Sequence, residues 1–537
     1  MSLIRACKVL GVLLVVGGLS FVSGADWNQW RGPNRDGVAP ESPPLSQEWP
    51  RQGPPEVWTS AEIPSERKGG FACVSTADGR AYAYSNWKYH VPTPTRTLNA
   101  DGLRRLGWRD DMPEDIREAT EKARLSEERQ GLEQNEVRGW AAEWVKENIS
   151  EENSKWRGDC QRRLLLGERA VPLEKLKQLA DIVHKEFPTQ DALDAWFAEH
   201  GIEGDVRSEI MKVIPDYNVR AKDVVFCFDA KTGETLWEKE TPGTVHDWAS
   251  SSTPCVAGGR VYLLASDATA VCLDAQTGSE VWKAETDAPR GGQPSASFAV
   301  VDGVAVLSAG PRTGYDPTSG DLLWQQKDVT GRHNSPTTWK TEGGTLLICQ
   351  TPQEVACVDP ADGRVLWQVK AGGSQSSATV EGDRMVVMGQ KEDWGVRCYR
   401  VTREGAEELW TASFGDRGAS PSIYGGAVYI MAEKPRPTVA CLDMQTGEVN
   451  WEKRVRRTQF SSPVVADGKL IVAANDTLML FAADPEECRL LGEARLGIAQ
   501  CTSPALADGR VYLRLKKGIG CFDLRPSAPK VAEEDTQ

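Results

Sequence analysis

The chain is poor in the residues and spacings from which most enzyme centres are built. Its 537 residues include only five histidines, and neither an H-E-x-x-H pattern nor a close Cys/His spacing occurs. The sequence also lacks the C-x-x-C-H signal for haem attachment, the G-x-S-x-G turn of serine hydrolases and the GxxxxGK[ST] phosphate loop. These absences argue against metal-dependent hydrolysis, covalent haem attachment and nucleotide hydrolysis. We therefore predict no catalytic or metal-ligating residues.

An excess of positive charge is also missing. The formal net charge is -14 and the isoelectric point is about 5.1. Nucleic-acid binding depends on a cationic surface that releases counterions, so no nucleic-acid partner is expected.

Long apolar runs are absent except near residue 1. Val9 to Phe21 is shorter than the ~20 residues of a membrane-spanning helix, follows Arg5 and Lys8, and precedes the small residues Ser23 to Ala25. This pattern is typical of a cleaved signal peptide, here residues 1–25. We expect the protein to be exported to the periplasm or cell envelope, or secreted. After cleavage it should contain no integral membrane segment, and we expect it to be monomeric.

A repeat dominates the rest of the chain. CFDAKTGETLW, from Cys227 to Trp237, recurs in recognisable form five times, and its tryptophans are 41 to 45 residues apart. A period of this length indicates a β-propeller. Each copy predicts a tight hairpin, in which Gly takes a positive φ, Asp or Thr bonds the turn, and Trp packs on a neighbouring hairpin. We assign a structural role to Trp58, Trp237, Trp282, Trp324, Trp367, Trp410 and Trp451.

A second hairpin with a Gly turn accompanies each copy and occurs eight times, so four strands form each unit. The predicted fold is all-β, an eight-bladed β-propeller with tryptophan-docking motifs. After Asp523 the outer strand is missing, and we expect the strand around Trp58 to supply it and close the ring. Gly492 stands where another unit has its Trp, which predicts poorer packing of that outer strand.

Residues 93–221 interrupt the β pattern with apolar residues at helical spacing, such as Leu176, Leu179 and Val183. They predict an α-helical insertion between the second and third strands of blade 1, beside the channel mouth. The predicted organisation is 1–25 signal peptide, 26–92 closing strand and first half of blade 1, 93–221 helical insertion, 222–526 the remaining blades and 527–537 a flexible tail.

The thirteen cysteines do not form an evident disulfide framework. Six of them occupy one position in different repeats, and equivalent positions on neighbouring blades lie too far apart for a bridge. We interpret these six as small buried residues.

The repeat [AV]-C-x-D-x-x-T-G-x-x-x-W resembles that of the PQQ-like, quinoprotein-type β-propellers, which include BamB and PQQ-dependent alcohol dehydrogenases. WNQWRGPNRDG, residues 27–37, also resembles the start of exported bacterial proteins of this type. The BamB resemblance implies a non-enzymatic scaffold without a cofactor, which binds a protein or a cell-envelope ligand. The alternative is a quinoprotein-like oxidoreductase with PQQ and calcium. The vicinal cysteine pair expected of such an oxidoreductase is absent from this sequence.

The inter-blade loops carry the candidate binding residues. These loops share one face of a propeller with the connection between second and third strands, so their polar side chains converge on one channel mouth. The alternative is that they are only solvated or cap the central channel. The candidate ligand or partner face comprises His246, Asp247, Trp248, Arg290, Gln293, Arg332, His333, Asn334, Gln375, Arg417, Arg457 and Gln459.

Overall fold

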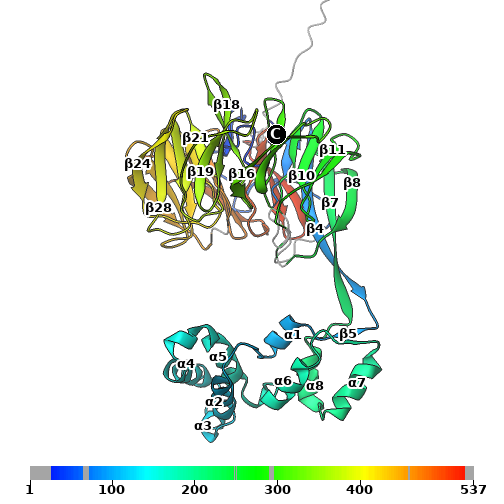
Figure 1. The fold of residues 1–537 in the computed structure, drawn as a ribbon. Helices are drawn as coiled ribbons and strands as arrows, with labels where there is room; N and C mark the ends of the chain where they lie inside the picture. Colours follow the sequence, from blue (N-terminus) through cyan, green and yellow to red (C-terminus); the bar gives the residue numbers. More distant parts are fainter. Residues whose placement is uncertain are drawn as a thin grey trace, which may run out of the picture. The chain divides into compact units, whose positions relative to one another are not determined.

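The computed structural model describes residues 26–63, 72–246, 248, 251–289, 295–457 and 460–526. The chain divides into two compact units. One combines Met1–Trp87 with Ala221–Gln537, and the other is Lys88–Arg220. Figure 1 shows strands in the first unit and helices in the second. Each unit is considered by itself.

The first unit is built from eight sheets, and each contains a run of antiparallel strands in chain order. The first four sheets are β3 (Ser75–Ala77), β4 (Arg80–Pro92), β7 (Tyr217–Asp229) and β8 (Thr235–Gly243); β9 (Cys255–Ala257), β10 (Arg260–Leu264), β11 (Thr269–Asp274) and β12 (Glu280–Glu285); β13 (Ala299–Val301), β14 (Val304–Ser308), β15 (Gly310–Tyr315) and β16 (Leu322–Gly331); and β17 (Thr337–Thr341), β18 (Gly344–Gln350), β19 (Glu354–Val358) and β20 (Val365–Lys370).

The remaining four sheets follow the same plan, and two of them also take a strand from the segment before residue 60. They are β21 (Thr379–Glu381), β22 (Arg384–Met388), β23 (Val396–Val401) and β24 (Ala406–Ala412); β25 (Ser422–Tyr424), β26 (Ala427–Ala432), β27 (Thr438–Asp443) and β28 (Val449–Arg454); β29 (Val464–Ala466), β30 (Lys469–Ala474), β31 (Thr477–Ala482) and β32 (Leu490–Arg495) with β1 (Val38–Ala39); and β33 (Ala505–Ala507), β34 (Arg510–Leu515) and β35 (Gly518–Asp523) with β2 (Glu56–Thr59).

The repeated turn works as its sequence predicts. In the β11–β12 hairpin, the Asp274 carboxylate accepts hydrogen bonds from the backbone N–H groups of Gln276 and Thr277. Gly278 has φ +70°, a conformation that suits glycine. Trp282 then pairs with Cys272, which is fully buried. The Asp, Gly, Cys and Trp of the repeat are therefore all explained by folding.

The repeat tryptophans join each sheet to the next. The Trp237 indole donates to the Ala275 carbonyl at 3.1 Å, and its ring covers Gly278, where a Cβ would come within 2.6 Å of the ring. The same bond recurs at each of the seven tryptophans assigned a structural role. The pairs are Trp58 to Ala230, Trp237 to Ala275, Trp282 to Pro317, Trp324 to Pro360, Trp367 to Thr402, Trp410 to Met444 and Trp451 to Asp484.

The two ends of the first unit are paired in one sheet. Strand β2 runs antiparallel to β35, with Trp58 opposite Cys521. Trp58 also docks on the first sheet through the Ala230 carbonyl at 3.0 Å. The strand around Trp58 therefore pairs with the last strand, as expected from the sequence, and covers the edge that β35 would otherwise expose.

The prediction of poorer packing at Gly492 is wrong. The ring of Trp49 lies over this glycine, and a Cβ there would come within 2.9 Å of the indole. Trp49 is only 7% exposed and belongs to the core around Trp27 and Trp58. A tryptophan from the segment before β2 therefore replaces the missing repeat tryptophan.

Residues 27–39, here called the plug segment, cross inner strands of the first unit. The inner strand of each sheet is the first of its antiparallel run in chain order: β3, β9, β13, β17, β21, β25, β29 or β33. Asn28 and Val256 exchange hydrogen bonds, and Val465 donates its N–H to the Gly37 carbonyl. The Arg31 guanidinium reaches Thr379 and Ser422, while that of Arg35 reaches the carbonyls of Phe298 and Pro336. Both arginines are at most 2% exposed. The plug segment thus binds inner strands of several sheets at once.

The second unit contains all eight α-helices that the structure describes. Two apolar clusters hold it together, one around Leu176 and Phe197 and one around Ile116 and Leu164. None of its helices combines the length and apolarity required to span a bilayer. The elements are β5 (Arg96–Thr97), α1 (Ala100–Arg105), α2 (Glu114–Arg124), α3 (Glu127–Gln130), α4 (Val137–Asn148), η1 (Glu151–Trp156), α5 (Arg157–Leu166), η2 (Gly167–Arg169), α6 (Leu173–Ala180), β6 (Glu186–Phe187), α7 (Gln190–Glu199) and α8 (Gly204–Met211).

Candidate functional site

A ring of hydrogen bonds links the starts of the inner strands. The residue two positions before an inner strand donates its backbone N–H to the side chain at the same position in the next sheet. Thr253 N to Ser297 Oγ is 2.9 Å, and Ser297 N to Ser335 Oγ is also 2.9 Å. We call this set the hydroxyl ring: Cys73, Thr253, Ser297, Ser335, Ser377, Ser420, Ser462 and Ser503.

The sequence explains the local backbone of the hydroxyl ring. In five of the eight positions a proline follows, as in Ser335-Pro336 and Ser503-Pro504. Proline restricts the preceding residue to extended conformations, which places its N–H toward the neighbouring sheet. The recurrence of a Ser/Thr-Pro pair just before an inner strand is therefore a sequence signal from which the ring could have been predicted.

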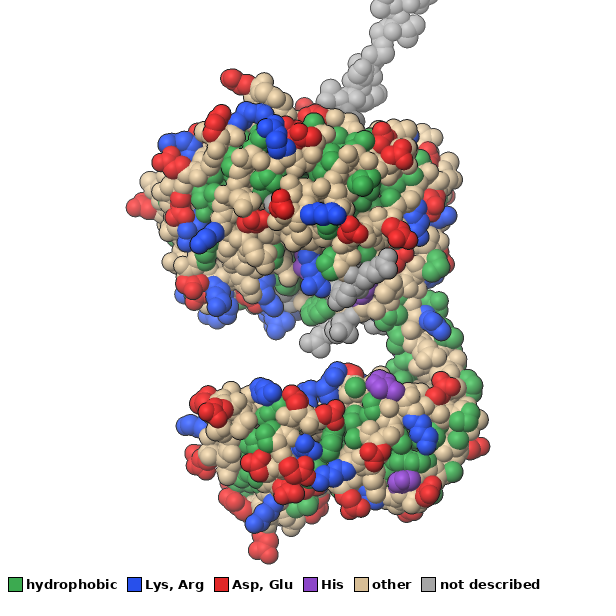
Figure 2. Space-filling model, viewed as in Figure 1, with side chains coloured by type: hydrophobic (Ala, Val, Ile, Leu, Met, Phe, Trp, Pro, Cys, Tyr) green, Lys and Arg blue, Asp and Glu red, His purple; other side chains and the backbone are tan. Residues whose placement is uncertain are grey.

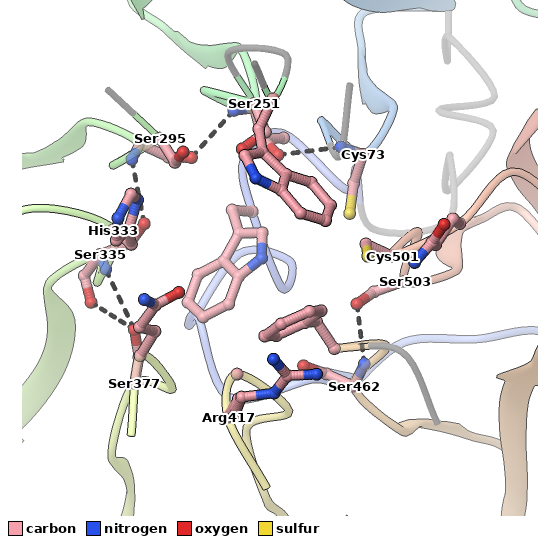
Figure 3. Close-up of a pocket in the computed structure, with 18 of the residues that line it drawn as sticks. Cys73, Ser251, Ser295, His333, Ser335, Ser377, Arg417, Ser462, Cys501 and Ser503 are labelled. Atoms are coloured by element: carbon pink, nitrogen blue, oxygen red, sulfur yellow. Dashed lines mark hydrogen bonds between the residues drawn. The ribbon is translucent and has the colours of Figure 1, made fainter. Parts of the chain in front are cut away.

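The residues two positions before the hydroxyl ring surround a cavity of about 410 Å³. This second tier varies from sheet to sheet, whereas the ring beneath it hardly varies. Figure 3 shows several of its members around one opening, with Ser251, Ser295 and His333 on different loops. The described members of this tier are Ser251, Ser295, His333, Gln375, Gly418, Phe460 and Cys501, and all of them line the cavity.

Trp30 of the plug segment also lines the cavity. The guanidinium carbons of Arg31 and Arg35 lie 5.6 and 5.8 Å from the centre of its ring. Neither guanidinium hydrogen-bonds a carboxylate; both bind backbone carbonyls and polar side chains. Burial lowers the pKa of Arg31 to about 9 and that of Arg35 to about 10, so both remain cationic at neutral pH. Two buried cations therefore lie next to this aromatic wall.

Phe460 contributes a second aromatic wall. A Cβ at Gly418 would come within 2.2 Å of the Phe460 ring, so the absence of a side chain at Gly418 makes room for it. The Arg417 guanidinium lies 5.3 Å from the same ring and pairs through Nε with Glu433 at 3.3 Å. Both partners of this ion pair are largely exposed, so it contributes little to stability.

Among the described lining residues, the titratable groups other than Arg417 are uncharged. Burial lowers the pKa of His333 to about 4, so its imidazole is neutral at pH 7. Burial raises the pKa of the Cys73 and Cys501 thiols, which therefore are not the thiolates that act as nucleophiles. Among its described residues the cavity thus has one cation, two thiols with raised pKa and one neutral imidazole.

The structure distributes the twelve candidate residues unevenly. Trp248, His333, Gln375 and Arg417 line the cavity. His246 instead contacts the Ser266 carbonyl, Asn334 is buried and donates to the Ser376 carbonyl, and Arg332 and Arg457 are exposed outside the lining. Asp247, Arg290, Gln293 and Gln459 lie outside the described residues. The lining also includes residues that the sequence patterns did not indicate, namely Trp30, Phe460, Cys73, Cys501 and the ring serines.

The described lining residues do not fit the calcium and PQQ of quinoprotein dehydrogenases. Calcium requires several oxygen ligands, commonly carboxylates, but no Asp or Glu is among the described lining residues. Within the described ranges, no three His, Cys, Asp or Glu side chains are grouped to hold a metal ion. The two lining cysteines are not neighbours in sequence, so the vicinal pair expected of such enzymes is not present.

Comparison with known families gives a direct match for the repeat region. The family described as outer membrane protein assembly factor BamB matches residues 217–337, 313–401 and 395–525. The chain belongs to this BamB family. It is therefore a PQQ-like repeat protein with the β-propeller fold that its sequence predicts.

Individual BamB proteins align with only part of the chain. BamB of Salmonella typhimurium is 24% identical over 168 residues, which are 29% of this chain and 41% of that protein. BamB of Escherichia coli K12 is 23% identical over 168 residues, which are again 29% of this chain and 41% of that protein. The matched region thus spans about two fifths of these relatives.

Solved structures of low similarity include BamB from Moraxella catarrhalis, with 15% identity and a TM-score of 0.46, covering 57% of this chain and 90% of that one. Another is the quinohemoprotein alcohol dehydrogenase of Comamonas testosteroni, with 13% identity and a TM-score of 0.43, covering 57% of this chain and 72% of that one.

Proposed function

We propose that this protein is an exported, non-enzymatic β-propeller that binds a cell-envelope ligand or an envelope protein at the cavity. In this proposal the eight sheets are the eight blades, residues 1–25 are a cleaved signal peptide, and residues 93–221 are a helical insertion in the first blade. The mature protein is monomeric and carries no integral membrane segment or cofactor.

The observation that carries the proposal is the two-tier construction of the cavity. The hydroxyl ring links the backbone at the starts of the inner strands, while the described second tier brings polar, aromatic, sulfur-containing and glycine positions from seven sheets to one cavity. Rigid scaffolds with variable convergent groups are typical of ligand sites. The BamB relatives are named outer membrane protein assembly factors, which supports an envelope role for this family member.

Charge on the visible surface of the propeller unit supports the choice of partner. Figure 2 shows Lys and Arg interspersed with Asp and Glu, without an extended basic patch on that face. Together with the net charge of -14, this favours proteins or envelope components over nucleic acids.

The test is thermal unfolding of the mature chain, residues 26–537, with separated envelope components: peptidoglycan fragments, envelope polysaccharides and unfolded outer-membrane proteins. We expect one component to raise the unfolding midpoint, since a ligand that binds only the native state stabilises it. The double variant Trp248→Ala/Arg417→Ala should lose this effect. Stabilisation that survives in the double variant, or none with any component, would contradict the proposal.

The alternative function, a PQQ-dependent oxidoreductase, is tested on the same protein. After incubation with PQQ and calcium followed by dialysis, we expect neither a retained quinone absorbance nor dye-linked alcohol oxidation, because the described lining residues supply no carboxylate for calcium. A quinone spectrum that survives dialysis would favour the enzyme.

A further inference from the structure

We propose that the cavity binds a sugar that carries one carboxylate, such as a uronic acid residue of an envelope glycan. This inference rests on the proposed function and names the chemical class of its ligand. It follows from three properties of the described lining residues: apolar flat walls, uncharged hydrogen-bonding groups and one accessible cation.

The flat walls are aromatic. Trp30, Trp248 and Phe460 line the cavity from three separate segments, and Trp248 is 43% exposed. A pyranose ring has faces formed largely by C–H groups, which bury apolar surface against an aromatic ring. Three aromatic walls around about 410 Å³ leave room for one or two sugar rings rather than for a protein loop.

The polar lining suits hydroxyl groups. Gln375, Gln390 and Gln500 present amides, which both donate and accept hydrogen bonds, and Ser251 and Ser295 present hydroxyls. A sugar hydroxyl is likewise both donor and acceptor, so it can pair with either group. A lining rich in such side chains is suited to a polyhydroxylated ligand.

The charge of the lining selects an anion. Arg417 is the cationic residue among the described lining residues, and no Asp or Glu lines the cavity with it. Its hydrogen bond to Glu433 uses Nε, which leaves the two terminal nitrogens for a carboxylate. Glu433 itself does not line the cavity. The Arg31 and Arg35 cations behind Trp30 add to the positive potential.

One carboxylate fits this arrangement better than several. A tricarboxylate such as PQQ would place three negative charges against the one accessible guanidinium among the described lining residues. The uncharged amides and hydroxyls would then face charges that they do not neutralise. A uronic acid instead matches Arg417 with its carboxylate and the rest of the lining with its hydroxyl groups.

The experiment measures binding to the mature chain by calorimetry and tryptophan fluorescence. The probes are trimers of galacturonate, glucuronate and mannuronate, and each is compared with its neutral trisaccharide. We expect at least one uronate trimer to bind with a Kd below about 1 mM and at least about tenfold tighter than its neutral counterpart. Arg417→Gln should abolish this preference, and Trp248→Ala should weaken binding of the uronate by about tenfold or more.

The control variant is Arg436→Gln, which removes an exposed arginine that pairs with Glu452 away from the cavity. It should leave binding unchanged. The inference is wrong if no uronate trimer binds, if neutral trimers bind equally well, or if Arg417→Gln keeps the preference. If an envelope component still stabilises the wild-type chain but not the double variant, the proposed function stands without the sugar.

Discussion

The indole of Trp49 lies directly over Gly492, with 2.9 Å between its atoms and the position of a Cβ at that glycine. Trp49→Ala should lower the free energy of unfolding by about 3 to 5 kcal/mol, as expected for a buried tryptophan. Gly492→Ala should also destabilise the fold because the new methyl group displaces the ring. Denaturant titration measures both effects.

The two substitutions should not be additive. In a Trp49→Ala background the methyl group of Gly492→Ala has no ring to displace, so its cost should become small. Gly139→Ala is a suitable control, since a Cβ there meets nothing within 4 Å. Additive effects would show that Trp49 and Gly492 are not in contact.

Removal of a plug arginine should destabilise the whole propeller unit. Arg35→Ala leaves the buried carbonyls of Phe298 and Pro336 without their donor, and each such group costs about 1 to 3 kcal/mol. We expect a loss of about 2 to 5 kcal/mol in unfolding free energy. Arg436→Ala, which removes an exposed ion pair with Glu452, should cost less than about 1 kcal/mol. Equal losses in the two variants would contradict the structural role of Arg35.

Cys73 is the one cysteine of the hydroxyl ring, so substitutions at this position test whether the ring stabilises the fold. Cys73→Ser places a hydroxyl, the side chain type of the other seven positions, and should leave the thermal midpoint unchanged or raise it. Cys73→Val keeps a buried apolar group but removes the polar side chain that contacts Ser503, so it should lower the midpoint. Equal midpoints for these two variants would show that position 73 does not take part in the ring.

His333 predicts a pH dependence of stability. Its folded pKa is lowered by burial to about 4, below the 6.5 of the unfolded chain. Between these values the unfolded chain binds a proton that the folded protein does not, so stability falls as the pH decreases from 6.5 to 4. Over this pH range, His333 should account for about 1 to 3 kcal/mol of the decrease in the free energy of unfolding.

His333→Gln should remove this part of the pH dependence, measured by urea unfolding at several pH values. An unchanged slope in His333→Gln would mean that the imidazole is solvated.

The second unit should be dispensable for folding of the propeller. It has its own apolar clusters, and the chain leaves the first unit in β4 and returns in β7. Replacing residues 93–216 by a short Gly/Ser turn should therefore preserve cooperative unfolding, since closing a long surface insertion costs little entropy. Loss of the folded state, judged by circular dichroism, would contradict this. Binding by the shortened chain tests the sequence prediction that the helices flank the mouth.

Local repeats allowed much of the fold to be predicted. The Asp, Gly, Cys and Trp of each copy act within one hairpin or between adjacent ones, so the spacing of Trp237 and Trp282 was sufficient to assign them. Closure by Trp58 also followed, because its strand has the same pattern as the others. Features that depend on single long-range contacts were not accessible. Nothing in the spacing of Trp49 indicated that it covers Gly492.

The candidate site was predicted only in part, for a similar reason. The inter-blade loops do carry lining residues, but polarity alone did not separate side chains that face the cavity from those that face away. His333 and Asn334 are adjacent, yet one lines the cavity and the other is buried against Ser376. Position relative to the Ser/Thr-Pro pair, two residues before it, would have made this distinction.

The plug segment has a consequence for the order of folding. Its hydrogen bonds join Arg31 to Ser422 and Arg35 to Phe298, partners that lie 391 and 263 residues away. During synthesis or export these residues appear long before their partners, so the segment cannot acquire its final contacts until most blades exist. Contacts of such long sequence separation form slowly. Residues 27–39 should therefore be among the last to become protected from hydrogen exchange during refolding.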